Sequence, residues 1–228
     1  MKKIHLDEII EGLRKNLIQM ATIIKESLDY SIKSFFEGNK NLAETVIKND
    51  SIADSMENKL DEEALAIFAL QQPIAIDLRF VVMVLKINND LERIGDLAVN
   101  ISERTIDLID NKYYNYYDQL INFAEINYIS KVCRDMVDLS IDALINKDVK
   151  KAREVIKKDL IVDSYNKSII LKCISEIKNN PESTEFFINI ITISKSLERI
   201  ADHTTNISED IIYMVEGENI KHSEKKFE

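Results

Sequence analysis

Pairs of carboxylates one helical turn apart are the residues of this chain best suited to chemistry. Four pairs stand at repeated positions with the spacing i, i+4: Asp50 with Asp54, Glu92 with Asp96, Asp159 with Asp163, and Glu198 with Asp202. Residues four apart share a helix face, so like charges at that spacing repel each other unless a cation neutralises them. Oxygen-only ligands suit Mg²⁺, Mn²⁺, Ca²⁺, iron and, less exclusively, Zn²⁺. The spacing therefore predicts metal binding.

The residues around these pairs are repeated as well. Leu91–Glu103 returns as Leu197–Glu209, 106 residues later, with nine of thirteen positions identical. Val46–Asp54 is echoed by Val155–Asp163 at nearly the same offset. The chain is therefore a tandem duplication, and each copy is expected to carry one metal site.

Long helices must position these carboxylates. Only four Gly and two Pro occur among 228 residues, too few for the turns of an all-β protein. The periodicity predicts helices over residues 7–36, 41–72, 74–109, 118–146, 148–178 and 182–215, with Pro73 opening the third helix. The predicted fold is all-α, with two tandem, pseudo-symmetric three-helix bundles. Their predicted limits are 1–112 and 113–217, with a polar, frayed tail over 218–228, and we expect the bundles to pack independently.

The third helix of each copy carries two stripes. Its apolar seam is Leu91, Ile94, Ala98 and Ile101 in the first copy, and Leu197, Ile200, Thr204 and Ile207 in the second. The carboxylates and one asparagine lie beside this seam. If the second and third helices are neighbours, their acidic pairs face each other and present four carboxylates to a common point. The alternative is that the repeated Leu-Glu-Arg-Ile is a packing motif, with Glu92 and Arg93 tied into structural salt bridges. Arg93 and Arg199 can be such structural partners in either case.

Charge, cysteine spacing and the length of apolar runs indicate which binding partners and which cellular compartment suit the chain. A net charge of −10 opposes a phosphate backbone and argues against nucleic acid. Cys133 and Cys173 lack a Cys-x-x-Cys spacing, which is typical of buried cysteines in a reducing compartment. The longest apolar run, Ala64–Leu70, has seven residues, against about twenty needed to span a bilayer. We expect a cytoplasmic protein without a transmembrane segment.

Two competing classes lack their signatures, and a third has a single candidate residue. A ferritin-type oxidase needs Glu-x-x-His pairs, and none of the three histidines has a Glu three residues before it. A nucleotide hydrolase needs a Gly-rich phosphate loop with Lys, which four scattered glycines do not provide. For a histidine phosphotransfer module His203 is the one reasonable candidate, although a polar supporting or capping role is favoured for it. Metal-free helical scaffolding stays open as the main rival.

The combined motifs resemble the PhoU family of phosphate-signalling regulators. The similarity rests on two tandem bundles, the acidic i, i+4 pairs, the repeated Leu-Glu-Arg-Ile-Gly/Ala-Asp segment, and Gln-Pro-x-x-x-Asp-Leu-Arg at residues 72–79. It implies a non-enzymatic negative regulator of phosphate uptake and phosphate-starvation signalling. The implied partners are a sensor histidine kinase and the ATPase subunit of a phosphate ABC transporter, and homodimers are implied as well. A regulator of another anion transporter is the alternative.

The resemblance also implies multinuclear clusters of Fe or Zn, with Mn or Mg possible, on the bundle surfaces. The implied ligands of the first site are Asp50, Asp54, Glu92 and Asp96, with Asn100 as a supplementary ligand; those of the second are Asp159, Asp163, Glu198 and Asp202, with Asn206. His203 stands where the first copy has Leu97, and the second copy lacks the Asp-Leu-Arg stretch. The two sites are therefore expected to differ.

Overall fold

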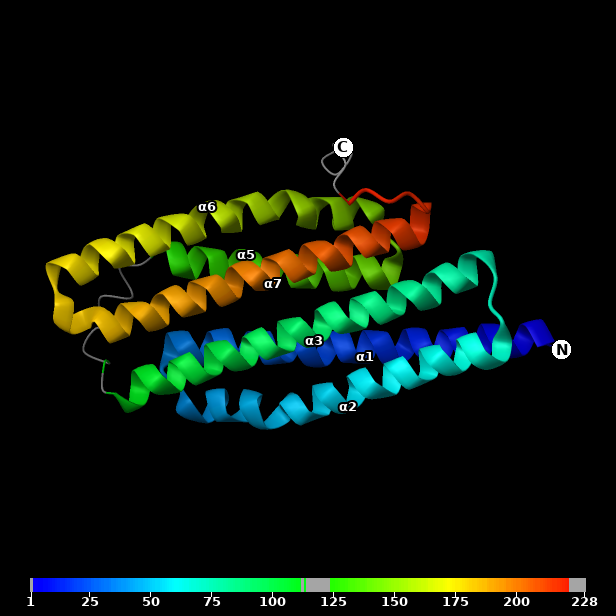
Figure 1. Ribbon diagram of the computed structural model, residues 1–228, viewed down its shortest axis with the longest axis horizontal. Helices are drawn as coiled ribbons and strands as arrows, with labels where there is room; N and C mark the ends of the chain where they lie inside the picture. The colour runs from blue at the N-terminus through cyan, green and yellow to red at the C-terminus, as the bar shows by residue number, and fades with distance from the viewer. Residues whose placement is uncertain (1, 112, 114–123, 222–228) are drawn as a thin grey trace.

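The computed structural model describes residues 2–111, 113 and 124–221, and these residues form long helices with short connections and no strand (Figure 1). The elements are α1 (Lys2–Glu37), α2 (Lys40–Gln71), α3 (Ala75–Asp110), α5 (Ala124–Asn146), α6 (Val149–Asn179), η2 (Pro181–Ser183) and α7 (Thr184–Glu216). The helices α1 to α3 form one bundle and α5 to α7 the other. The predicted all-α fold with two tandem three-helix bundles is confirmed. The predicted domain limit lies between residues 112 and 113, and residue 112 is outside the described part of the chain. Residue 118, where the fourth helix was predicted to begin, is outside it as well.

Local signals end the helices where the sequence indicates. Gly38 follows α1 with φ +59°, a left-handed conformation that glycine adopts without steric cost. Asn39 then caps α2, because its side chain accepts a hydrogen bond from the Leu42 amide. One detail differs from the expectation for Pro73. The proline lies in the connection, and α3 begins two residues later because Ile74 has an extended backbone as its N-cap.

Each bundle buries the predicted apolar seam of its third helix. In α3, Ile94 and Ile101 are completely buried, and their counterparts in α7, Ile200 and Ile207, are buried as well. Burying an isoleucine or leucine side chain stabilises a fold by about 1.5–3 kcal/mol, so the seams account for much of the packing within each bundle. Both cysteines, Cys133 and Cys173, are buried free thiols, as expected.

The expectation that the bundles pack independently is wrong. The helices α3 and α7 run antiparallel along the boundary between the bundles (Figure 1), and the buried apolar residues of both halves form one continuous cluster. A periodicity analysis of one apolar seam misses this second contact because polar side chains contribute to it. Ser196 on α7, for example, is 4% exposed and donates a hydrogen bond to Asn100 on α3 at 3.0 Å.

A pseudo-two-fold relation links the two bundles. The boundary between α1 and α5 carries two ion pairs, Lys25 with Asp138 and Asp29 with Arg134, each at 2.6 Å. Lys25 and Asp29 align with Arg134 and Asp138 in the repeat, at an offset of 109 residues. Each ion pair is therefore the image of the other. The interface between the copies has the self-complementary form of a symmetric dimer contact.

The start of the C-terminal tail is ordered against the second bundle, contrary to the expectation of a frayed segment. Gly217 ends α7 with φ +76°, and its amide donates to the Tyr213 carbonyl at 2.9 Å. Ile220 is 1% exposed, and the Lys221 ammonium lies 3.0 Å from the buried Asp210 carboxylate. One apolar residue and one buried charge therefore hold residues 217–221 in place. Residues 222–228 lie outside the described part of the chain.

Candidate metal sites and the boundary between the bundles

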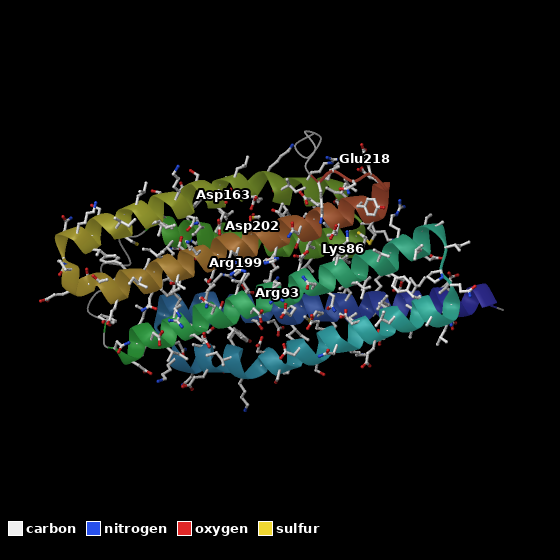
Figure 2. The ribbon with its side chains drawn as sticks, in the orientation of Figure 1. Lys86, Arg93, Asp163, Arg199, Asp202 and Glu218 are labelled. Atoms are coloured by element: carbon white, nitrogen blue, oxygen red, sulfur yellow. The ribbon has the colours of Figure 1, made fainter. Side chains whose placement is uncertain are left out.

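The second copy brings three predicted ligands together. Asp159 and Asp163 on α6 and Asp202 on α7 each offer a carboxylate oxygen, and these oxygens lie within 4.8 Å of one another. Figure 2 shows Asp163 and Asp202 next to each other on neighbouring helices. Among the side chains that the structure describes, this is the one group of three with such geometry. An oxygen donor set of this kind fits a hard or borderline cation.

Glu198, the fourth acid predicted for this site, lies at its edge. Burial raises the pKa of its carboxyl, and the negative charges of Asp202 and Asp163 raise it further. Glu198 therefore interacts electrostatically with both Asp202 and Asp163, although its oxygens are not part of the three-oxygen group. The expected convergence of four carboxylates is realised for three of them.

A polar pocket of about 430 Å³ adjoins this group. Asp159 and Asp202 belong both to the ligand group and to the pocket wall. Arg199 and His203 from α7 and Lys221 from the tail line the pocket as well. The pocket therefore joins carboxylates to basic and neutral donors at one place.

The first copy also places its acids across the α2–α3 boundary. Burial raises the pKa of Asp50, and the charges of Asp54 and Asp96 raise it further. Burial, followed by the charge of Asp96, raises the pKa of Glu92 to about 7. Because the charge of Asp96 on α3 raises the pKa of Asp50 on α2, the two predicted pairs face each other. However, no three of their oxygens lie within 4.8 Å of one another, as three do in the second copy.

Arg93 explains part of this difference. Its guanidinium Nε lies 3.2 Å from Glu92 Oε2, and its Nη1 donates a hydrogen bond to Asp96 at 3.1 Å. These contacts draw two of the four carboxylates toward one cation on their own helix. The structural salt bridges named as an alternative for Arg93 are therefore present. The side chain is half exposed, so the bridges are weak and leave room for exchange with a metal ion.

Glu57 belongs to the first acidic group although it was not among the predicted ligands. Its pKa is raised by burial first and then by the charges of Asp61, Asp54 and Asp96. The spacing of Asp50, Asp54, Glu57 and Asp61 places all four on one face of α2. This shared face is the sequence feature that could have identified Glu57 as a member of the group. In the second copy the position of Glu57 is taken by Asn166, whose side chain accepts a hydrogen bond from Ser194 at 2.7 Å.

The two predicted asparagine ligands lie at the boundary between the bundles. Asn100 accepts the hydrogen bond from Ser196 described above. Asn206 donates to Asp90 at 3.3 Å, and the same Asp90 oxygen lies 2.8 Å from His203 Nδ1. Ser196 and Asp90 are equivalent positions of the repeat, so the two asparagine contacts are images of each other. Both asparagines thus have a structural role in joining α3 to α7.

The site residues would hold a metal ion as follows. In the second copy Asp159, Asp163 and Asp202 would supply the three carboxylate oxygens that lie close together. Glu198 interacts electrostatically with Asp202 and Asp163. A bound cation would supply positive charge that cancels the repulsion among these acids. No described helix combines the length and apolar character needed to cross a membrane.

These features define a class, a duplicated helical-bundle protein with an acidic group in each copy. The model of the PhoU domain matches residues 17–105 and 126–211 of the chain. The chain belongs to the PhoU family, as the resemblance of its motifs indicated, and the two matches correspond to its two repeats.

Relatives of nearly equal length support this assignment. A protein of Aquifex aeolicus named phosphate-specific transport system accessory protein PhoU homolog is 33% identical over 217 residues, which cover 95% of this chain and 96% of the relative. PhoU homolog 1 of Thermotoga maritima, with the same description, is 31% identical over 96% of this chain and 92% of its own length. The crystal structure of PhoU from Pseudomonas aeruginosa superposes with a TM-score of 0.86 at 30% identity, covering 93% of this chain and 99% of that one.

Proposed function

We propose that this protein is an accessory regulator of a phosphate-specific transport system and that it represses phosphate uptake and phosphate-starvation signalling. The single observation that carries the proposal is the match to phosphate-transport accessory proteins over almost the whole chain, through both repeats. The proposed partners are the ATPase subunit of a phosphate ABC transporter and a sensor histidine kinase. Regulation then works by binding and not by catalysis.

Metal ions are proposed to control this binding. Three carboxylate oxygens within 4.8 Å in the second copy, and the raised pKa values of Asp50 and Glu92 in the first, support cation sites on both bundles. Iron or zinc is proposed for both, with Mn²⁺ or Mg²⁺ as alternatives. A regulator of this kind shifts a partner only by binding one of its states more tightly than the other, so metal loading would act by changing the acidic surface that a partner meets.

The regulatory proposal is tested by deleting the gene and measuring transcripts for phosphate transport and scavenging in phosphate-rich medium. Loss of the repressor should switch these genes on. Capture of the purified transporter ATPase and the kinase by metal-loaded protein, compared with protein in chelator, tests the direct contact. Unchanged transcripts together with absent capture would refute the proposal. Induction of genes for another anion transporter would instead support the alternative assignment.

The metal proposal has its own test. Elemental analysis of protein purified without chelator should find several metal ions per chain, and the melting temperature should rise when metal is added to apo-protein, because a ligand that binds the native state stabilises it. Sedimentation velocity on the same samples tests the expected homodimer. No bound metal and no thermal shift with Fe, Zn or Mn would favour the metal-free scaffold.

A further inference from the structure

The pocket beside the second acidic group contains anion-binding donors in addition to carboxylates. Arg199, His203, Thr205, Asn206 and Lys221 all line it. Its volume is about 430 Å³, and one liquid water occupies about 30 Å³, so there is room for a metal ion and a small anion together. We propose that this pocket binds inorganic phosphate, held between a metal ion on Asp159, Asp163 and Asp202 and the donors that line the pocket.

Thr205 is the observation that points to a ligand independently of the acids. Its side chain is 4% exposed, it lines the pocket, and its hydroxyl has no hydrogen-bond partner among the residues that the structure describes. A buried hydroxyl without a partner is destabilising, and most buried polar groups are satisfied. A phosphate oxygen in the pocket would accept a hydrogen bond from this hydroxyl.

Comparison of the two copies separates the phosphate donors from the metal ligands. The first copy keeps the acids and the arginine of the motif, with Arg93 in place of Arg199. However, Leu97 stands in place of His203, and Val99 in place of Thr205. Next to its carboxylates the second copy therefore has two polar side chains where the first has apolar ones. The contact of His203 with Asp90 at 2.8 Å accounts for one of these differences, and metal binding accounts for neither. Thr205, whose hydroxyl has no partner among the described residues, is the difference that an oxyanion ligand explains.

The charges of the pocket make phosphate binding depend on metal. Three carboxylates line it, Asp159, Asp202 and Glu209, against the two cations of Arg199 and Lys221. With Asp163, the third ligand of the acidic group, these charges sum to −2 without metal, which repels an anion. A bound divalent ion is the largest local charge in such a site and cancels this sum, which removes the repulsion. Arg199 is then in place to bind the remaining phosphate oxygens, and Lys221, whose ammonium lies 3.0 Å from Asp210, adds positive charge at the pocket wall.

This inference rests on the metal site of the proposed function and adds a ligand to it. It gives the protein a direct way to register phosphate, since metal and phosphate would fill the second site together. The first site, which lacks the added donors, would bind metal alone. The two copies would then have separate tasks, one of them sensitive to phosphate.

The test is equilibrium dialysis of radiolabelled inorganic phosphate against the full chain, loaded with Zn²⁺ or treated with chelator, with metal content measured in the same samples. Loaded protein should bind about one phosphate per chain, and chelator should abolish binding. Thr205→Val combined with His203→Leu restores the residues of the first copy and should weaken phosphate binding about tenfold or more while metal content stays unchanged. Arg199→Gln should do the same, and Arg93→Gln at the first site is the matched control that leaves binding intact.

The outcomes separate this inference from the metal proposal. Metal retained without phosphate bound overturns the phosphate site and leaves the metal site standing. Wild-type protein that holds no metal overturns both. Equal phosphate binding in chelator, or binding unchanged in the Thr205→Val, His203→Leu variant despite a native melting curve, also overturns the phosphate site. Phosphate lost from the Arg93→Gln control as well as from the second-site variants would place the anion elsewhere and overturn it too.

Discussion

Replacing Glu92 with Gln should stabilise the metal-free protein above pH 7 and change its stability little below pH 4.5. Burial and the neighbouring Asp96 raise the pKa of Glu92 to about 7 in the folded chain, from an ordinary value of 4.5. Below 4.5 the carboxyl is protonated in both the folded and the unfolded chain. As the pH rises toward 7, the unfolded chain releases its proton first, so the free energy of unfolding falls.

The size of this effect follows from the two pKa values. A difference between 4.5 and about 7 corresponds to about 3 kcal/mol at about 1.36 kcal/mol per pH unit. The Glu92 side chain is 16% exposed, and screening by solvent reduces the effect to about 1–2 kcal/mol. For a chain of this length about 1 kcal/mol shifts the melting temperature by roughly 2–4 °C. The variant should therefore melt about 2–8 °C above wild type at pH 8.

The assay is urea and thermal unfolding in chelator at pH 4.5, 6 and 8, for wild type, Glu92→Gln and the control Glu62→Gln. Glu62 is an exposed residue of α2 that takes no part in the acidic group, so its replacement should have a small effect at every pH. If Glu92→Gln has the same effect at pH 4.5 and pH 8, or destabilises at pH 8, the reasoning about the buried carboxyl is refuted.

Asp163→Asn with Asp202→Asn should remove the metal of the second site and leave that of the first, as elemental analysis can show; loss of all metal would mean that the sites are coupled. Ile94→Ala, in a completely buried position, should lower the free energy of unfolding by about 2–5 kcal/mol in urea titrations, and a loss below about 1 kcal/mol would contradict the assigned core. A double-mutant cycle on the partly exposed pair Asp29 and Arg134 should give a coupling of at most about 1 kcal/mol, and a larger value would show that this pair is more than a surface salt bridge.

The sequence predicted the helices well because their signals are local. The apolar seam around Ile94 has helical spacing, and Gly38 with Asn39 forms a stop and a cap that act within a few residues. The position of Pro73 relative to α3 differed because a proline is compatible with both a first helical turn and the preceding connection. The extended backbone of Ile74 determines where α3 begins, and hydrophobic periodicity does not predict that conformation.

The acidic groups were predictable only in part. The repeat identified Asp159, Asp163 and Asp202, which the structure brings together. It did not select Glu57, because the level at which two antiparallel helices face each other depends on packing across the bundle. The contacts of Asn100 and Asn206 were missed for a related reason. They join α3 to α7, and a polar residue carries no signal that distinguishes a metal ligand from a partner in another helix.

The mirrored contacts at the boundary between the bundles have an evolutionary consequence. A self-complementary interface, with each ion pair repeated by its image, is what two identical single-repeat chains would form as a homodimer. Any mutation in such a homodimer enters both halves at once. Joining the copies in one chain removes this constraint and makes their association independent of protein concentration. The two halves were then free to differ, with Leu97 and Val99 in one and His203 and Thr205 at the equivalent positions of the other, so that a single gene carries two different sites on one symmetric frame.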